Sequence, residues 1–429
     1  MQESQVTSPR TPALLCDATF YGTLAAVRSL GRAGIPVDVV HAERAALASW
    51  SKYATRRLCG PEASTGNTLV EWLMEVGHRD GRRVIYPTSD EMVFLLSAHR
   101  ERLEERFLLL QPDLETTLRV LDKKSLHAAS REAGVETPET WFPDGAADAL
   151  RVARSTEAPL MFKPRTQLFL TNHIKGALAP RDPTQLREAY ETFRTTHTYG
   201  APIAGIRDDV TAPMLQRYYP EAADGIYSLT GFRDRSGKHL ALLGSTKVLQ
   251  RPRRLGIGLC FESAQVPEAL ERGARKLLDV LGYFGVFELE FIVSSGRYLL
   301  IDMNPRFYNH LQLDVSRGLD LPMMAYAAAV GDDDRVAELA GRASKAAVEH
   351  VFCNRIGLGI QVTAQRLFGT MPRAEAKRWR EWTRARRATL VDPISAADDR
   401  APIVAESVSQ LYGSIRHPRA FLRMIALDR

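Results

Sequence analysis

The stretch "FELEFIVSSGRYLLIDMNPR", residues 287–306, indicates the fold of this 429-residue chain more clearly than any other segment. Two apolar runs flank "SSGR", and this pattern is typical of a β-hairpin with a tight turn. Because side chains alternate between the faces of a strand, Glu288 and Glu290 share one face of the first strand, and Asp302 and Asn304 share one face of the second. The hairpin would therefore place these acids and the amide side by side.

The oxygen atoms of Glu290, Asp302 and Asn304 suit Mg²⁺, which prefers hard oxygen ligands and usually completes its shell with phosphate and water. Mn²⁺ has similar preferences and is the alternative ion, whereas the absence of histidine and cysteine from this cluster argues against zinc. Lys163 ends the apolar run "LMFKP", and a lysine at a strand end suits phosphate as a point charge. A lone strand lysine or glutamate is more often plain surface, but together these residues predict a site for a polyphosphate and a metal ion.

The length of the chain implies two or three domains. Residues 1–112 alternate apolar strand patterns with helical patterns, which predicts an α/β domain with a parallel sheet. Residues 113–335 contain the hairpin above, a second hairpin turning at "DRSGK" and a strongly helical segment, "LETTLRVLDKKSLHAASREAG", that stops at Gly134. This combination of hairpins and a helical segment predicts an α+β domain of mainly antiparallel sheet. Residues 336–429 are predicted to form a mostly helical, basic extension.

Polar residues follow two of the predicted strands of the first domain, at the edge where ligands of parallel sheets gather. We therefore consider them candidates for a substrate-binding rim. Asp17 and Asp90 have an equally weighted alternative role, because aspartate often caps the helix that follows it. The rim candidates are Asp17, Thr19, Tyr21, Thr88, Ser89, Asp90 and Glu91.

Composition narrows the class of protein. No apolar run reaches the length of a membrane span, and the first ten residues lack the organisation of a secretory signal, so no membrane partner is expected. The four cysteines form no C-x-x-C pair, which favours a reducing cytoplasm over a disulfide framework or a zinc site. The formal net charge of +6 is mild for this length and typical of a solvated surface.

The order of these parts resembles the ATP-grasp superfamily, and within it the carboxylate–amine ligases similar to D-aspartate ligase. The resemblance runs from about residue 12 to about residue 330. Its strongest element is the final pair of strands, where family members have an acid–phenylalanine pair followed by E-x-N-P-R. The matching segments, in the family's order, are "DKKSLHAASREAGVETPET", "PLMFKP", "LQRYYPE", "GIYSLTGFRDRSGKHLALLGSTKVLQRPRRLGIG" and "FELEFIVSSGRYLLIDMNPR".

The resemblance implies roles for the matching positions. Two lysines would contact the ATP phosphates, a linker would hydrogen-bond adenine through its backbone, and an acid after the linker would accept from the ribose hydroxyls. The implied ATP residues are Lys123, Lys163, Gln216, Arg217, Tyr218, Tyr219 and Asp224, with Glu221 as a less favoured ribose ligand. Glu290, Asp302 and Asn304 would hold Mg²⁺. Arg306 and Lys247 would neutralise the substrate carboxylate and the transferred phosphoryl group, with help from the basic loop at Arg251, Arg253 and Arg254.

The implied reaction joins a small carboxylic acid to an amine, both amino-acid-like. A carboxylate oxygen attacks the γ-phosphorus of ATP, ADP leaves, and an acyl-phosphate forms. An amine then attacks the acyl carbon, and phosphate departs to leave an amide. Two anions must approach each other in the first step, so cationic residues and the metal ion supply most of the catalysis.

The segment after Lys163, "PRTQLFLTNHIKGALAP", residues 164–180, departs from the family pattern. Family members place a Gly/Ser-rich turn here, whose backbone N–H groups cradle phosphate. This segment has one glycine, Gly176, and three bulky residues, "LFL". Three interpretations stay open: polar side chains substitute for the turn, the segment packs on a hydrophobic substrate, or phosphate binding is weakened. The substituting side chains would be Thr166, Thr171, Asn172 and Lys175. Two departures are smaller. Asp302 replaces the glutamate that family members usually have, and Arg217 replaces the acid that usually precedes the two aromatic residues of the linker.

Several rival interpretations remain. The fold could serve as a non-catalytic ATP-binding module, which the unusual segment favours, or as an ATP-grasp carboxylase that takes bicarbonate. The basic region around Trp379 and Trp382 suggests a nucleic-acid patch, but no nucleic-acid motif accompanies it, so no nucleic acid is expected. The aromatic residues Tyr21, Phe307 and Tyr308 suggest a substrate with some apolar surface. A homodimer is the default oligomeric state.

Overall fold

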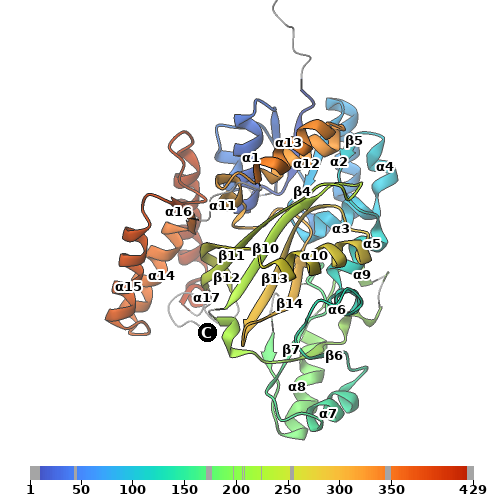
Figure 1. Ribbon diagram of the computed structural model, residues 1–429, viewed down its shortest axis with the longest axis vertical. Helices are drawn as coiled ribbons and strands as arrows, with labels where there is room; N and C mark the ends of the chain where they lie inside the picture. The colour runs from blue at the N-terminus through green and yellow to red at the C-terminus, as the bar shows by residue number, and fades with distance from the viewer. Residues whose placement is uncertain are drawn as a thin grey trace, which may run out of the picture.

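A computed structural model gives the fold of residues 10–42, 46–170, 176–196, 198–204, 206, 208–223, 225–251, 256–343 and 349–422. Figure 1 shows the N-terminal domain at the top, a large twisted sheet in the middle and a small subdomain at the bottom. In these residue ranges no helix is long and apolar enough to cross a membrane.

The N-terminal domain contains a five-stranded sheet in which all neighbouring strands are parallel, as predicted. Its elements are β1 (Ala13–Cys16), α1 (Tyr21–Arg32), β2 (Val37–His41), η1 (Leu47–Trp50), β3 (Ala54–Cys59), η2 (Ala63–Thr65), α2 (Asn67–Asp80), β4 (Arg83–Pro87), α3 (Asp90–Ala98), α4 (Arg100–Glu104) and β5 (Phe107–Leu109). The strand order β3-β2-β1-β4-β5 changes direction between β1 and β4. Parallel sheets bind ligands at the carboxyl ends of strands at such a switch point, and the predicted rim follows these two strands.

Two helices, α5 (Leu114–Leu121) and α6 (Lys123–Glu132), replace the uninterrupted helical segment expected before Gly134. Asp122 separates them because its backbone is extended and its carboxylate accepts a hydrogen bond from the backbone N–H of Lys124, which caps α6. Arg165 holds the same carboxylate through Nε at 3.1 Å and Nη2 at 2.8 Å. The break places Lys123 at the first position of α6.

A four-stranded sheet with the order β6-β9-β7-β8 forms the small subdomain at the bottom of Figure 1. We call it the β6–β9 subdomain. Its elements are β6 (Thr140–Trp141), α7 (Ala146–Arg154), β7 (Leu160–Lys163), β8 (Ala177–Leu178), α8 (Pro183–Thr196), α9 (Ala201–Ala204), η3 (Asp208–Thr211) and β9 (Met214–Arg217). One face of the sheet packs on α7 and α8 through a small apolar core that includes Phe162, Tyr190 and Leu215. Strand β7 carries the predicted phosphate contact Lys163, and β9 carries the first two residues of the predicted adenine linker, Gln216 and Arg217.

The large sheet has seven strands in the order β14-β13-β10-β11-β12-β15-β16. Its central elements are η4 (Pro220–Ala223), β10 (Ile226–Arg233), β11 (Leu240–Arg251), β12 (Ile257–Ala264), α10 (Glu268–Leu281), β13 (Gly285–Ser294) and β14 (Arg297–Asn304). Both predicted hairpins, β10–β11 and β13–β14, are present and antiparallel. Ser295 and Gly296 both have positive φ between β13 and β14, which matches the twist of a two-residue hairpin turn.

The remaining helices complete the fold on either side of this sheet. They and the last two strands are α11 (Leu311–Ser316), α12 (Leu321–Val330), α13 (Asp333–Ala343), β15 (Val351–Cys353), α14 (Arg355–Leu367), α15 (Arg373–Ala385), β16 (Leu390–Val391), α16 (Ala401–Arg416) and α17 (Pro418–Phe421). Strand β15 pairs with β12, so the C-terminal extension joins the large sheet. Trp379 is buried, and the Nε1 of Trp382 donates to Glu262 at 2.6 Å. One tryptophan thus packs in the protein interior and the other hydrogen-bonds to the protein itself, which argues against the nucleic-acid patch.

Candidate active site

The β13–β14 hairpin assembles the predicted oxygen-rich cluster. In its register Glu290 lies opposite Asp302, and Glu288 lies opposite Asn304. The side chains of Glu290 and Asp302 are 20% and 34% exposed, whereas Glu288 is only 4% exposed. Asn304 donates from Nδ2 to Glu288 at 2.9 Å. The hairpin therefore presents two partly exposed carboxylates beside a buried acid, Glu288, and a half-buried amide, Asn304.

Two lysines hold the accessible carboxylates. The Nζ of Lys123 lies 2.7 Å from Asp302 Oδ1, and the Nζ of Lys247 lies 2.7 Å from Glu290 Oε1. Burial disfavours the ammonium group of Lys247, but Glu290 and the neighbouring acids outweigh burial, so the pKa of Lys247 is raised. The two carboxylates and the two lysines thus form one cluster in which positive and negative side chains lie next to each other. The cluster is built from α6, β11 and the hairpin.

Arg306 joins this cluster to the N-terminal domain. Its Nε lies 2.6 Å from Asp90 Oδ1, and its Nη2 donates to Asn304 Oδ1 at 3.3 Å. Burial disfavours the guanidinium, but Asp90 more than compensates and raises the pKa of Arg306. Asp90 does not cap α3, because Ser89 accepts the capping bond from the N–H of Met92. The rim residue Asp90 therefore lies in the same site as the predicted catalytic arginine.

The rim residue Asp17 is not a helix cap either. The residue before α1 is Phe20, which makes no side-chain cap. Asp17 adopts a φ of 96°, rare for a residue with a side chain, and its carboxylate accepts from the N–H of Thr19 at 3.0 Å. Its carbonyl oxygen accepts from the hydroxyl of Thr23 at 2.8 Å. Strained backbone of this kind tends to concentrate at functional sites, and here it lies at the switch point.

Residues predicted to bind ATP meet beside the hairpin. Lys163 donates from Nζ to Gln216 Oε1 at 3.0 Å, and Gln216 donates from Nε2 to Thr140 Oγ1 at 3.1 Å. Lys123 and Gln216 line one pocket between α6, β9 and β14. The other side chains of that pocket are Leu126, His127, Ser130, Thr137, Thr140, Met214, Leu300 and Ile301.

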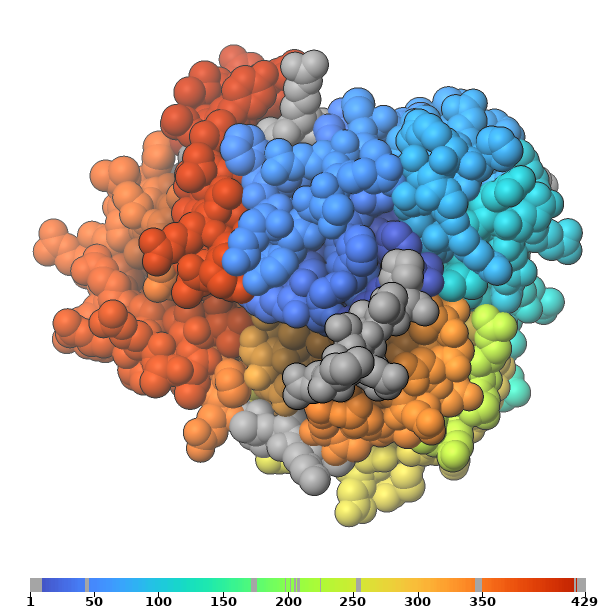
Figure 2. Space-filling view, turned by 90° about the horizontal axis from the view of Figure 1, so that it is seen from above, coloured from blue at the N-terminus to red at the C-terminus, as the bar shows by residue number. Residues whose placement is uncertain are grey.

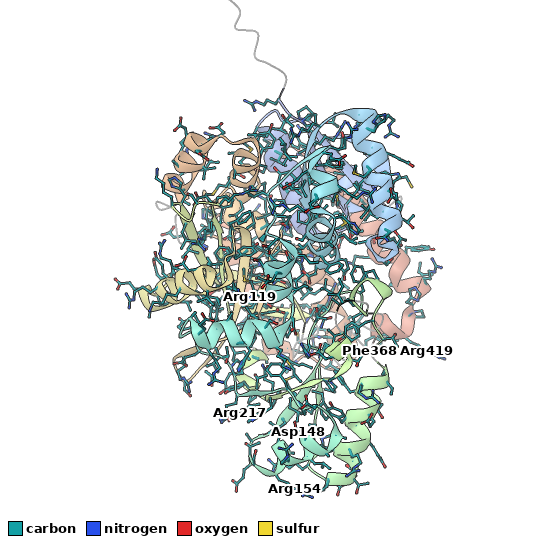
Figure 3. The ribbon with its side chains drawn as sticks, turned by 90° about the vertical axis from the view of Figure 1, so that its right-hand side faces the viewer. Arg119, Asp148, Arg154, Arg217, Phe368 and Arg419 are labelled. Carbon is teal, nitrogen blue, oxygen red and sulfur yellow. The ribbon has the colours of Figure 1, made fainter. Side chains whose placement is uncertain are left out.

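The predicted adenine linker begins inside β9 with the buried Gln216 and is exposed or half-buried from Arg217 to Tyr219. Arg217 pairs with Glu139 at 2.6 Å, and the N–H of Tyr218 donates to the carbonyl of Pro159 at 2.8 Å. Tyr219 packs on an apolar cluster that includes Ile292. Figure 3 shows Arg217 above Asp148 and Arg154 of α7, near the lower end of the molecule. Glu221 accepts from the hydroxyl of Ser294 at 3.1 Å. The predicted residues Asp224, Lys175, Thr171, Asn172, Arg253 and Arg254 lie outside the described residues.

The bulky residues after Lys163 pack on protein. Leu168, Phe169 and Leu170 are buried, and the first two belong to the core of the N-terminal domain. The rings of Phe169 and Phe94 meet edge to face at 5.6 Å. The hydroxyl of Thr166 accepts from the N–H of Leu168 at 3.2 Å. The interpretation that these residues pack on a hydrophobic substrate is therefore wrong, because they join the β6–β9 subdomain to the N-terminal domain instead.

Sequence reasoning did not assign roles to Glu288 and His310. Burial, followed by repulsion from Glu290, raises the pKa of Glu288 to about 8. Burial lowers the pKa of His310 to about 3, and its Nδ1 lies 3.7 Å from Glu288 Oε1. The ring of His310 stacks on Phe261 with centroids 4.0 Å apart. Strand alternation correctly placed Glu288 on the face of Glu290, but no periodicity marks the turn that directs His310 inward.

The donor set fits a hard divalent ion. Within the described ranges no three His, Cys, Asp or Glu side chains are grouped as a metal site. The candidate set instead contains two carboxylates and an amide, Glu290, Asp302 and Asn304, on one face of a hairpin. Mg²⁺ commonly binds through one or two carboxylates and takes its other ligands from phosphate and water. The partial exposure of both carboxylates leaves room for those ligands.

Comparisons with known proteins agree with this architecture. No protein family's sequence profile matches the chain. Formate-dependent phosphoribosylglycinamide formyltransferase from Haloquadratum walsbyi is 23% identical over 242 residues, 54% of this chain and 54% of that protein, so the chain spans about half of its length. Biotin carboxylase from Campylobacter jejuni has a TM-score of 0.58 and 19% identity, covering 75% of this chain and 71% of its own. L-amino acid ligase from Bacillus licheniformis has a TM-score of 0.55 and 13% identity, covering 77% of each chain. The chain has the ATP-grasp fold.

Proposed function

We propose that the protein is an ATP-dependent carboxylate–amine ligase, which forms an amide through an acyl-phosphate and releases ADP and phosphate. The observation that carries this proposal is that Lys247 and Arg306 lie beside the carboxylates of the β13–β14 hairpin, Glu290 and Asp302. Arg306 is also paired with Asp90 of the N-terminal rim. Phosphoryl transfer to a carboxylate requires cations that neutralise two approaching anions. The site supplies those cations at the switch point where a substrate is expected.

The ATP-binding roles follow from the pocket between α6, β9 and β14. Lys123 and Lys163 bind the phosphates, because Lys123 lines that pocket and the ammonium group of Lys163 donates to Gln216, which lines it too. The backbone of Gln216 to Tyr219 contacts adenine, and Asp224 accepts from the ribose. The apolar side chains Leu126, Met214 and Leu300 suit the faces of the base.

Glu290, Asp302 and Asn304 would hold Mg²⁺ or Mn²⁺, and the bound ion would supply charge neutralisation at the transferred phosphoryl group. Arg306 binds the reacting carboxylate, because its guanidinium adjoins both the hairpin and the rim. Lys247 stabilises the phosphoryl oxygens; the carboxylate oxygen bonds to the γ-phosphorus as the bond to ADP breaks. The amine then attacks the acyl carbon, phosphate leaves with the bonding electrons, and the proton lost by the nitrogen goes to the departing phosphate.

Two rival functions have support of their own. Biotin carboxylase has the higher TM-score of the two solved structures above, and a carboxylase would place bicarbonate where the ligase places its acid. A non-catalytic ATP-binding module is favoured by the segment 168–170, which packs into the N-terminal core instead of offering a glycine-rich turn. The charged cluster favours the ligase, because a module that only binds ATP has no need for Arg306 at the rim.

ADP release from Mg²⁺-ATP separates these functions. The purified protein is incubated with pools of carboxylic acids and amino acids, with bicarbonate alone in a separate arm, and Asp302→Ala serves as the control. A ligase releases ADP with one acid–amine pool and loses this activity in the variant. Release with bicarbonate alone would identify a carboxylase. If no pool stimulates release while ATP still raises the unfolding midpoint, the protein is a binding module.

A further inference from the structure

A second polar cluster lies where the N-terminal domain, the large sheet and the C-terminal extension meet. Tyr21, the first residue of α1, donates its hydroxyl to Glu406 of α16 at 2.8 Å. Asn354, the N-cap of α14, donates to the same hydroxyl at 2.9 Å, and Gln410 donates to Glu406 at 2.9 Å. Glu406 is only 7% exposed. It is therefore a buried carboxylate held by neutral donors.

Arg251, the last residue of β11, supplies the opposite charge. Among the described residues its Nη1 is buried and has no hydrogen-bond partner. Burial lowers the pKa of Arg251, whereas nearby Tyr21 and Glu406 act in the opposite direction. Strand pairing places Arg251 opposite Ile257 of β12, and the N–H of Asn354, whose side chain holds Tyr21, donates to the carbonyl of Leu259 on the same strand at 3.0 Å. The end of β11 therefore lies beside the residues that hold Glu406, yet within the described part of the chain no ion pair joins Arg251 to Glu406. A partly buried guanidinium that lacks an anion is costly, so this position suits an anionic ligand.

The cluster adjoins the candidate active site. Arg251 follows Lys247 by four positions on β11. Gly22, next to Tyr21, packs so tightly on the loop after Arg306 that an added Cβ would lie 2.6 Å from the carbonyl oxygen of Tyr308. The rim, the loop after Arg306 and the end of β11 therefore meet around Tyr21.

The C-terminal extension is firmly anchored at this junction. Arg28 of α1 lies 2.9 Å from Asp399, both side chains are 1% exposed, and Arg28 also donates to the carbonyls of Pro393 and Ile394. The hydroxyl of Ser51 donates to Asp399 at 2.7 Å. Figure 2 shows the C-terminal segments lying against the N-terminal domain. This anchor fixes α16, and with it Glu406, relative to Tyr21.

We propose that Arg251 and Glu406 form a subsite for the amine substrate and require it to be a zwitterion, with its carboxylate on Arg251 and its ammonium group on Glu406. This inference rests on the proposed ligase function, in which Arg306 is reserved for the acid that reacts with ATP. Tyr21 and Asn354 are positioning residues, because they hold the Glu406 carboxylate from the rim and from α14. A simple amine leaves Arg251 unpaired, and a simple acid leaves Glu406 unpaired.

Binding to the full chain tests the subsite without requiring turnover. Pools of L- and D-α-amino acids are added with Mg²⁺ and a non-hydrolysable ATP analogue, and the unfolding midpoint is measured. For the pool that binds, the matching primary amines and carboxylic acids are then tested separately. The subsite predicts that the amino acids raise the midpoint and that neither analogue does. A pool of simple amines that binds as well as the amino acids would overturn it.

Variants assign the effect to the two charges. Arg251→Met and Glu406→Gln should each weaken amino-acid binding on the order of 30-fold or more, and Arg251→Lys should weaken it less. Arg416→Met, at an exposed position at the far end of α16, is the matched control and should bind normally. The rise in the unfolding midpoint caused by the ATP analogue alone should be unchanged in Glu406→Gln and Arg416→Met. Normal amino-acid binding by Arg251→Met, or no binding of any pool by the wild type, contradicts the subsite.

The outcomes also separate this inference from the proposed function. If amino acids bind through Arg251 but ADP is never released, the subsite stands and the ligase proposal fails. If ADP is released with simple amines and Arg251→Met is fully active, the ligase proposal stands and the subsite fails.

Discussion

Arg306 and Asp90 form an ion pair, 2.6 Å between Nε and Oδ1, that joins the end of β14 to the first turn of α3. The pair links the hairpin that carries the metal-binding candidates with the switch point of the parallel sheet. The orientation of Arg306 therefore depends on the N-terminal domain as well as on its own strand.

Asp90→Asn tests this dependence. The variant keeps a hydrogen-bond acceptor but removes the charge that holds Arg306, so the arginine should lose its fixed orientation toward the reacting carboxylate. We expect kcat to fall by up to about 10²-fold, with the KM for ATP little changed. Steady-state kinetics measure both values. Asp148→Asn, on α7 of the β6–β9 subdomain, is the control. An unchanged kcat in Asp90→Asn would show that Arg306 needs no support from the rim.

Phe169→Ala tests the anchoring of the β6–β9 subdomain. Phe169 is buried in the core of the N-terminal domain against Phe94, so its truncation leaves a cavity there. We expect the free energy of unfolding to fall by about 3 kcal/mol. Phe368→Ala is the matched control, because Phe368 is 54% exposed and its loss should cost less than about 0.5 kcal/mol. Urea unfolding measures the free energy of unfolding of both variants. Equal effects of the two substitutions would contradict the observed packing.

Glu288→Gln tests the raised pKa of the buried acid. The folded protein keeps a proton on Glu288 up to a pKa of about 8, whereas the unfolded chain releases it near 4.5. Its contribution to stability is therefore fully present below pH 4.5 and is lost as the pH rises toward 8. Relative to the variant, metal-free wild type should lose at most about 1.4 kcal/mol of unfolding free energy per pH unit in this window.

Urea unfolding at several pH values between 5 and 7.5 measures this loss. Glu115→Gln, at an exposed position on α5, should follow the wild-type profile. Parallel profiles for wild type and Glu288→Gln would show that Glu288 is ionised in the fold.

The sequence predicted what depends on local pattern. Strand alternation and the "SSGR" turn are short-range signals, and they correctly placed Glu290 opposite Asp302. The break at Asp122 was missed because the apolar periodicity continues across it. The interaction that stabilises the break comes from Arg165, 43 residues away. A helical pattern contains no information about such a distant partner.

The parts of the site that were not predicted depend on tertiary packing. The bulky residues after Lys163 were recognised as unusual, but their destination in the core around Phe94 depends on how two domains meet. The same holds for the pair of Arg306 with Asp90, which are 216 positions apart. Composition and spacing identify such residues as candidates, and only the fold shows which of them meet.

Trapping the acyl-phosphate with hydroxylamine tests the central claim most directly, because hydroxylamine replaces the unknown amine. Pooled carboxylic acids, Mg²⁺-ATP and hydroxylamine are incubated with the wild type and with Lys247→Met and Asp302→Ala, and hydroxamate and ADP are both quantified. The account predicts one hydroxamate for each ADP from at least one pool, with loss of both products in the two variants. ADP release without hydroxamate, or no release from any pool by a protein that binds ATP, would contradict it.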